Sequence, residues 1–273
     1  MKRLFVAGPG LALALMGIGG AHSAEWRLDF DAAPLGPVTA EQLKSLSPVP
    51  VLWAGGFARD GEEGRFRVTE SSGHGRALQV LYPRGGVGPQ KTGGQWLAAL
   101  PPRIAYDLEY RVRFGVDFDW RRGGKLPGLA GGTVPTGGNF DPDGFSSRYM
   151  WRDDGRLVVY LYWAGQASAG RERGRQYGVD LDCGVTLERG RDHRLRQRVT
   201  LNTPGRADGR LEVWVDGRQV LARSDLLFRD QPGKTWAIDR FLFSTFHGGN
   251  DPTWAPRRDS TVEFDDIVIT AAD

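Results

Sequence analysis

An uninterrupted alternation of apolar and polar side chains constrains the fold of this chain most. Between Asp107 and Phe118 every second residue is apolar, and most residues between them are charged. Successive side chains of a β-strand point to opposite faces, so the pattern predicts a half-buried strand with one polar face. The apolar residues expected to share a face are Leu108, Tyr110, Val112, Phe114, Val116 and Phe118.

Short segments of similar character recur along the chain. The further strands expected are Trp26–Phe30, Phe66–Thr69, Ala77–Tyr82, Gln95–Leu100, Phe145–Arg152, Leu157–Trp163, Leu195–Leu201, Leu211–Val215, Gln219–Ala222, Phe241–Phe246 and Thr261–Ile269. Asp154-Gly155 and Asp216-Gly217 each separate two of them and predict hairpin turns, because glycine accepts positive φ. A short helix is expected only at Ala40–Leu46. These features predict an all-β fold, a jelly-roll sandwich of two antiparallel sheets.

The first residues read as a targeting segment. Lys2 and Arg3 precede an uncharged apolar stretch, and small residues follow it up to Ala24. This arrangement predicts a signal peptide over residues 1–24, with cleavage near residue 24. We therefore expect a secreted or periplasmic protein with no integral membrane segment, in which residues 25–273 form a single domain and a monomer.

The charge of the mature chain is close to zero. The sequence has 36 Lys and Arg against 33 Asp and Glu, and losing two basic residues with the signal leaves 34 against 33. An anionic partner must therefore be attracted by a local patch. Arg194, Arg196 and Arg198 alternate along one predicted strand. The neutral overall charge and the export signal nevertheless argue against nucleic-acid binding.

Two smaller features limit the other possibilities. Cys183 is the only cysteine, which excludes an intrachain disulfide and a cysteine-based zinc site. We expect it to be a buried, inert thiol. The adjacent acidic residues Asp265 and Asp266 predict a bulge in the last strand.

The segment from Gly123 to Gly144 stands apart in composition. It contains eight glycines and three prolines, which are unfavourable in strands and helices. Long connections within compact domains are usually functional or disordered, and the apolar residues Leu126, Leu129 and Phe140 favour partial packing over disorder. We therefore expect an irregular binding loop beside the sheet.

The predicted hairpin on either side of Asp154 concentrates polar groups on one face. The two-residue period places Ser146, Arg148 and Arg152 together with Tyr160 and Tyr162 on its outer side. Arginine binds carboxylates through paired hydrogen bonds, and tyrosine offers a ring and a hydroxyl to a sugar. Ordinary exposed residues of a sheet would show the same pattern. These residues alone predict, at most, a face that binds acidic glycans.

Four segments extend this interpretation through a resemblance. They are GGKLPGLAGG at 123–132, FSSRYMWR at 145–152, YLYW at 160–163 and STFHGGNDPTWAP at 244–256. In order and spacing they resemble the signature blocks of the polysaccharide lyase family 14 alginate lyases. The resemblance implies a β-jelly roll that cleaves alginate or a related polyuronate by endolytic β-elimination, with no cofactor and no metal.

The resemblance also implies site residues. The functional lysine of the family falls on Lys125, its Ser-x-Arg pair on Ser146 and Arg148, and its Tyr-x-Tyr pair on Tyr160 and Tyr162. Lys125 and Arg148 would neutralise the uronate carboxylate with help from Ser146. One tyrosine would be the base and the other the acid, and Tyr162 is favoured for proton transfer. Lys125 is the alternative base, a role that lysine allows and arginine does not.

Further substrate contacts are expected from Arg152, His247 and Trp254, with Trp120 as a weaker candidate. His247 stands where many relatives carry an aromatic residue, so it is either a subsite residue or a loop histidine bonded to backbone. The competing function is a non-catalytic β-sandwich that binds acidic glycans. A glycoside hydrolase would need two carboxylates at the cleavage point, whereas this face is cationic and phenolic. The preferred uronate (mannuronate, guluronate or glucuronate) stays open.

Overall fold

A computed structural model of the chain describes residues 24–58, 64–72, 75–166, 169–172 and 174–272. The predicted signal peptide lies outside the described residues except for Ala24, so it stays a prediction. None of the helices in the described ranges has the length and apolar character needed to cross a membrane.

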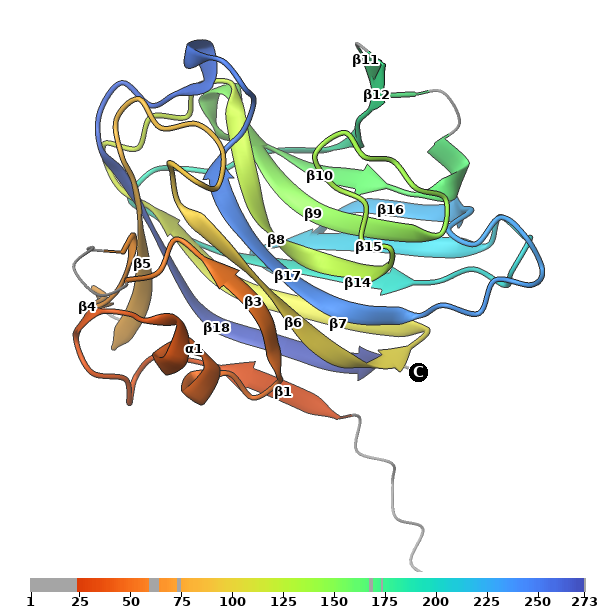
Figure 1. The fold of residues 1–273 in the computed structure, drawn as a ribbon, viewed down its shortest axis with the longest axis horizontal. Helices are drawn as coiled ribbons and strands as arrows, with labels where there is room; N and C mark the ends of the chain where they lie inside the picture. Colours follow the sequence, from red (N-terminus) through yellow and green to blue (C-terminus); the bar gives the residue numbers. More distant parts are fainter. Residues whose placement is uncertain (1–23, 59–63, 73–74, 167–168, 173, 273) are drawn as a thin grey trace, which may run out of the picture.

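The described strands form two stacked antiparallel sheets and one small hairpin (Figure 1). The first sheet has nine strands in the order β16-β15-β14-β7-β18-β5-β4-β2, with β1 beside β18. Their bounds are β16 (Arg218–Leu226), β15 (Gly209–Val215), β14 (Asp192–Thr200), β7 (Ala105–Phe114), β18 (Ser260–Ala272), β5 (Arg76–Tyr82), β4 (Phe66–Glu70), β2 (Gly36–Pro37) and β1 (Glu25–Leu28).

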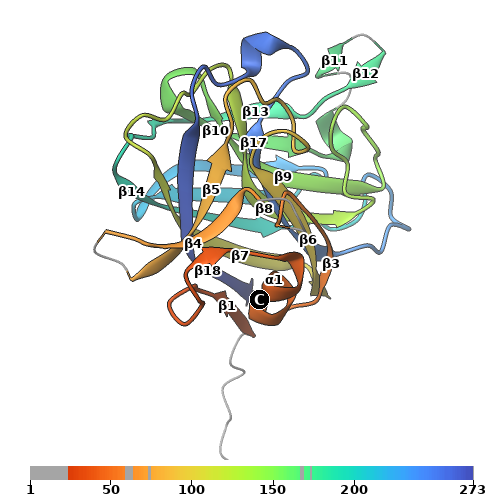
Figure 2. The same cartoon turned by 60° about the vertical axis from the view of Figure 1, so that its left-hand side comes forward.

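The second sheet has seven described strands in the order β13-β10-β9-β8-β17-β6-β3. They are β13 (Val179–Thr186), β10 (Arg156–Tyr162), β9 (Gly144–Arg152), β8 (Gly123–Gly132), β17 (Ile238–His247), β6 (Gly94–Arg103) and β3 (Val51–Gly55). The hairpin of β11 (Arg171–Glu172) and β12 (Arg175–Gln176) projects from the body of the sandwich (Figures 1 and 2). The predicted two-sheet jelly roll is confirmed.

Most of the local predictions hold. The one described α-helix, α1 (Ala40–Leu46), has the predicted bounds and begins with a capping box between Thr39 and Gln42. The described residues also contain three short 3-10 helices, at Asp153–Gly155, Ala164–Gln166 and Pro252–Trp254. Both hairpin turns form, with φ of 55° at Asp154 and 51° at Asp216. The core between the sheets is rich in aromatic rings, such as Trp96 and Phe243, which stack with their centroids 3.7 Å apart.

The strand predicted from Asp107 to Phe118 is shorter at its end. β7 stops at Phe114, and the next residues turn, so that the Phe118 backbone N–H donates to Gly115 O. Phe118 still packs in the core, but Val116 is 73% exposed. The expectation that Val116 shares the core face was therefore wrong, because the strand geometry that sets the alternation ends at the turn.

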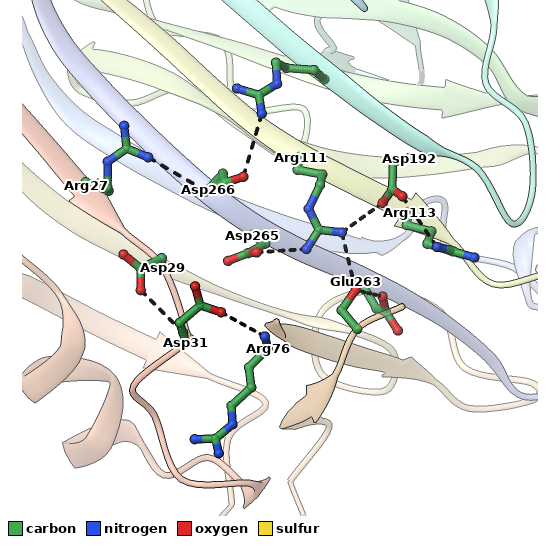
Figure 3. Close-up of polar contacts among 12 residues, drawn as sticks. Arg27, Asp29, Asp31, Arg76, Arg111, Arg113, Asp192, Glu263, Asp265 and Asp266 are labelled. Carbon is green, nitrogen blue, oxygen red and sulfur yellow. Dashed lines mark hydrogen bonds and ion pairs between the residues drawn. The ribbon is translucent and has the colours of Figure 1, made fainter. Parts of the chain in front are cut away.

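The outer face of the nine-stranded sheet carries a network of ion pairs (Figure 3). At its centre is Arg111, which is only 3% exposed and donates to Asp265 and to Asp192, each over 2.8 Å. The bulge predicted at Asp265 and Asp266 is present, since the pairing of β18 with β7 shifts between Asp265 and Val268. Asp265 itself pairs directly with Arg111 across β18 and β7, on the side of the bulge where the register is regular.

The alternating arginines of β14 belong to the same network. Arg194 contacts Glu109, whereas Arg196 and Arg198 both donate to Asp107. These carboxylates already neutralise the stripe that could have suggested nucleic-acid binding.

The glycine-rich segment was predicted wrongly. Gly123–Gly132 is not a loop but β8, a central strand of the seven-stranded sheet between β9 and β17. Its glycines are needed because neighbouring chains approach too closely for side chains. A Cβ at Gly124 would overlap the Trp151 ring, and one at Gly128 would overlap Ser147 O. Only the second part of the segment, residues 133–143, is a connection, and it folds back over the sheet.

We expect Gly128→Ala to destabilise the protein by about 1–3 kcal/mol, because the added methyl group forces the β8 and β9 backbones apart. Gly55→Ala in β3 is the matched control, since a Cβ there meets nothing within 4 Å. Urea unfolding of both variants measures the difference. Equal midpoints for the two variants would contradict the close approach of β8 and β9.

Candidate active site

The strand pairing confirms the face predicted for the β9–β10 hairpin. Arg148 pairs with Tyr160 and Ser146 pairs with Tyr162, so these four residues share one side of the seven-stranded sheet. Tyr149 and Trp151, which alternate with these residues along β9, point to the opposite side and lie in the core. β8 brings Lys125 beside Met150 on the same outer side.

A cleft of about 1740 Å³ lies over this side of the sheet. Among its lining residues are Lys125, Arg148, Arg152, Tyr160 and Trp254, which the sequence had nominated. Loops and the β11–β12 hairpin form its walls. The structure thus brings five of the eight nominated residues into one cavity.

Three basic side chains surround the ring of Tyr160. Lys125 Nζ lies 3.4 Å from the ring centroid, and the guanidinium carbons of Arg152 and Arg148 lie 5.7 and 5.9 Å from it. Tyr160 is only 8% exposed. Burial raises the pKa of this phenol above its usual value, and the nearby Tyr162 raises it further, while Arg148 and Arg152 oppose the shift. At neutral pH Tyr160 therefore holds its proton.

The same environment shifts the pKa of Lys125 in the opposite direction. Burial lowers the pKa of its amine well below the ordinary value, and the charges of Arg148 and Arg152 lower it further. The hydrogen-bond partner of Nζ is the thioether sulfur of Met150 at 2.6 Å, which carries no charge to stabilise the ammonium form. Lys125 is therefore suited to exist as a neutral amine.

Arg148 is a buried cation without a counter-ion. Its side chain forms no ion pair with any described residue, and only 2% of the residue is exposed. Its single hydrogen bond is a long one from Nη1 to Ser244 Oγ, 3.5 Å, while Nε and Nη2 have no partner. Burying a charge in this state is costly. An anion that binds from solution would supply the counter-ion that Arg148 lacks.

Arg152 already has a carboxylate. It donates from Nε and Nη2 to Asp180, over 2.8 and 2.5 Å, and both residues line the cleft. Asp180 comes from β13, a strand that was not predicted from the sequence, although Val179, Leu181, Cys183 and Val185 alternate along it with polar residues or glycine.

Two of the nominated residues lie beneath the cleft wall. Ser146 and Tyr162 are fully buried, and neither lines the cavity. Ser146 Oγ donates to Pro135 O over 2.6 Å, and Tyr162 Oη accepts from the Gly138 backbone N–H over 2.9 Å. Both side chains therefore fasten the 133–143 connection to the sheet. Strand parity gives the face of a residue but not what covers it, and the roles of Ser146 and Tyr162 as reacting groups stay predictions.

His247 does not reach the cleft either. It is fully buried and packs against Phe118, Tyr82 and Trp151, with Nε2 hydrogen-bonded to Asp119 O over 2.8 Å. Burial lowers its pKa to about 4, so it is neutral. The predicted substrate contact is thus replaced by the alternative already considered, a structural histidine bonded to backbone.

The remaining candidate residues differ in whether they reach the cleft. Trp120 is buried against Phe114 and Phe118 and is a core residue, not a subsite residue. Trp254 is partly exposed in the cleft, with the Arg122 guanidinium 4.9 Å from its ring centroid. Cys183 is buried as predicted, and burial raises the pKa of its thiol to about 12.

Metal ligands do not gather anywhere in the described ranges. These residues contain no group of three or more His, Cys, Asp or Glu side chains placed to hold an ion. The groups that line the cleft beside Tyr160 are basic side chains, the Met150 thioether and the Asp180 carboxylate.

The sequence also matches the model of a known protein family. The model of the family described as Polysaccharide lyase 14 matches residues 70–267, more than half of the chain. The chain belongs to the polysaccharide lyase 14 family. It is therefore a polysaccharide lyase, and the matched region contains every strand that lines the cleft except β3.

Solved structures show the same fold. Alginate lyase Aly36B matches with a TM-score of 0.73 and 23% identity, over 91% of this chain and 97% of that one. The PL-14 alginate lyase of Aplysia kurodai matches with a TM-score of 0.72 and 23% identity, over 90% and 98%. The endo-β-1,4-glucuronan lyase of the fungus Trichoderma reesei matches with 0.51 and 13%, over 88% and 95%. No curated protein matches the sequence of this chain.

The contrast between two buried arginines yields a prediction. Arg111→Met should cost about 3–5 kcal/mol, because it leaves Asp265 buried and unpaired. Arg148→Met should instead leave the stability unchanged or increase it, because it removes an uncompensated buried charge. Urea unfolding of the two variants compares them directly. A loss in Arg148→Met as large as that in Arg111→Met would show that Arg148 is stabilised by a partner in the free protein.

Proposed function

We propose that this polysaccharide lyase cleaves a uronate polymer by β-elimination at Lys125, Arg148 and Tyr160. The observation that carries the proposal is Arg148, a buried cation that faces an open cleft without a counter-ion. A uronate supplies the missing carboxylate, and a guanidinium binds it through paired charge-assisted hydrogen bonds.

Arg148 would also activate the substrate. The C5 proton of a uronate is α to the carboxylate and is weakly acidic while that carboxylate carries a full charge. Removing the proton moves further negative charge onto the carboxylate oxygens. A fixed cation in a poorly solvated site stabilises this developing charge strongly.

Lys125 and Tyr160 would divide the proton transfers. Lys125 has a lowered pKa and can accept the C5 proton on its neutral Nζ, whereas Tyr160 has a raised pKa and keeps a proton to donate. Two groups whose pKa values are shifted in opposite directions are suited to act as base and acid.

The proposed reaction is then balanced. The C5–H bond breaks and its proton goes to Lys125 Nζ. The C4–O bond breaks, the electron pair of the former C5–H bond becomes the C4=C5 double bond, and the leaving oxygen receives the proton of Tyr160 Oη. Proton exchange with solvent restores both side chains.

Tyr160 replaces Tyr162 as the favoured proton-transfer residue. Tyr160 lines the cleft beside Lys125, whereas the Tyr162 hydroxyl is buried and accepts from Gly138. Ser146 would support the reaction indirectly, by holding the 133–143 connection against the sheet, whereas Tyr162 would do this and also help to keep the pKa of Tyr160 raised.

The cleft as a whole suits a polyanion. Besides the reacting residues it is lined by Lys91, Arg122, Arg152, Arg171, Arg175 and Arg240, against the carboxylates of Glu172, Asp180 and Asp251. Alginate and glucuronan, the polymers named for the solved relatives, are both built of uronates. A variant of Aly36B has been solved with an alginate tetrasaccharide. We propose the same class of substrate here, alginate or polyglucuronate.

We also propose that the enzyme meets this substrate outside the cytoplasm, in the periplasm or after secretion. The support is the predicted signal peptide over residues 1–24, whose basic start, apolar stretch and small residues lie at the N-terminus. The monomeric state remains a prediction of the same kind.

The proposed roles separate the two tyrosines. On separated polymannuronate, polyguluronate and glucuronan, the wild type should produce unsaturated sugar ends that absorb in the ultraviolet. Tyr160→Phe should lower kcat by about 10²–10⁴-fold, the usual contribution of a general acid. Tyr162→Phe should keep most activity and lose about 1 kcal/mol of stability with its hydrogen bond. An inactive Tyr162→Phe beside an active Tyr160→Phe would reverse the assignment.

The same assay tests the whole proposal. A wild type that binds these polymers but leaves their length unchanged, with no ultraviolet product, would be the non-catalytic acidic-glycan binder instead.

Lys125→Arg distinguishes a base from a simple cation. Arginine keeps the positive charge but does not lose its proton, so the variant should lose about 10²–10⁴-fold in kcat/KM if Lys125 is the base. Lys91→Arg, at an exposed position of the same cleft, is the matched control and should stay active.

The pH dependence supplies a second readout. In the wild type kcat/KM should rise with pH as Lys125 loses its proton, and the midpoint should lie well below 10.5 because the pKa is lowered. The high pKa of Tyr160 predicts no loss from phenol ionisation below about pH 10. An active Lys125→Arg variant with an unchanged pH profile would exclude Lys125 as the base.

A further inference from the structure

A single cross-strand row links the proposed reaction centre to the far edge of the seven-stranded sheet. Trp53 of β3 pairs with Leu97 of β6, and Leu97 with Leu242 of β17. From there Leu242 pairs with Gly128 of β8, Gly128 with Arg148 of β9, and Arg148 with Tyr160 of β10. Directly paired residues lie on the same face, so the row runs along the side of the sheet that carries the cleft, and each member except Gly128 lines it.

The two ends of the row differ in chemistry. Tyr160 and Arg148 form the charged end, while Leu242, Leu97 and Trp53 form the apolar end. Gly128 separates the two ends, and no side chain rises from the floor there. Trp53 is four inter-strand spacings from Arg148, about 19 Å. It therefore lies beyond the reach of a sugar bound at Arg148.

Trp53 is exposed where tryptophan is normally covered. Its exposed fraction is 42%, and Leu52 beside it is 51% exposed, although both line the cleft. Within the described residues no other aromatic side chain is among the large exposed hydrophobic ones. The pairing of β3 with β6 shifts between Val51 and Trp53, a bulge that makes room for Leu52 and reorients the strand. Exposed apolar groups inside a polar cleft indicate a binding surface.

We propose that Trp53 is a distal subsite residue whose ring stacks on a sugar of the uronate chain several units from the point of cleavage. This inference rests on the proposed function and adds the path of the polymer, along the row from Tyr160 to Trp53. The apolar face of a pyranose ring matches the tryptophan ring, with Leu97 and Leu242 as the floor before it. Arg240, two residues before Leu242 on the same face of β17, also lines the cleft and supplies positive charge for the carboxylates.

A subsite this far from Arg148 acts only on substrates long enough to reach it. Trp53→Ala should therefore raise KM for long polymer about tenfold and leave kcat nearly unchanged. On the shortest oligosaccharide that the wild type cleaves, the variant and the wild type should have the same kcat/KM. Trp53→Phe should recover part of the loss, because it keeps an aromatic ring.

Trp214→Ala is the matched control. Trp214 is a partly exposed tryptophan of β15, on the other sheet, where it contacts Arg196 through its ring face. Thermal unfolding of both alanine variants reports any general loss of stability. Polymer binding is measured in parallel by affinity electrophoresis in gels that contain alginate or glucuronan, which needs no turnover.

The outcomes separate the two proposals. Weakened polymer binding and a raised KM in Trp53→Ala, but not in Trp214→Ala, support the proposed path of the polymer. Identical behaviour of the two alanine variants, or an equal loss on short and long substrates, would overturn it. A wild type that binds polymer through Trp53 without producing unsaturated ends would refute the lyase mechanism and keep the path. A wild type that neither binds nor cleaves would remove both.

Discussion

The close packing of β8 between β9 and β17 is the constraint on which the rest of the site depends. A side chain at Gly124 would overlap Trp151, and one at Gly128 would overlap Ser147. Because glycine has no side chain, the β8 backbone can pack closely against its neighbours in the middle of the sheet. The same strand carries Lys125 on its outer side, beside Met150. The glycines therefore place the amine near the arginine and the phenol, and Gly128, which pairs with Arg148, adds no side chain between the charged and apolar ends.

The two faces of the sandwich use buried arginine for opposite purposes. Arg111, under the outer face of the nine-stranded sheet, is held by Asp265 and Asp192, and its charge is compensated within the fold (Figure 3). Arg148, on the cleft side of the other sheet, has no such partner among the described residues. A compensated cation stabilises the fold, whereas an uncompensated one costs stability and attracts an anion. Functional sites are commonly built at this kind of cost.

One environment accounts for both proposed proton-transfer groups. Poor solvation disfavours the charged form of any group, so it lowers the pKa of Lys125 and raises that of Tyr160. The neighbouring arginines strengthen the effect on the lysine and weaken it on the tyrosine. A bound substrate carboxylate would in turn neutralise the charge of Arg148, so the substrate would provide the counter-ion that the fold does not.

Because a strand alternates its side chains with a fixed period of two, the sandwich, most strand positions and the side of the sheet that carries Arg148 and Tyr160 could be predicted from the sequence. The family resemblance added that Lys125 joins them. Which of those residues meet solvent depends on contacts between segments distant in sequence. Ser146, Tyr162 and His247 are removed from the cleft by a connection and by aromatic packing, both of which involve residues distant in sequence. β8 escaped prediction for the same reason, since glycine in a strand reports the closeness of neighbouring chains, which periodicity along one chain does not contain. Trp53 acquired its position opposite Leu97 only when β3 paired with β6 at the sheet edge.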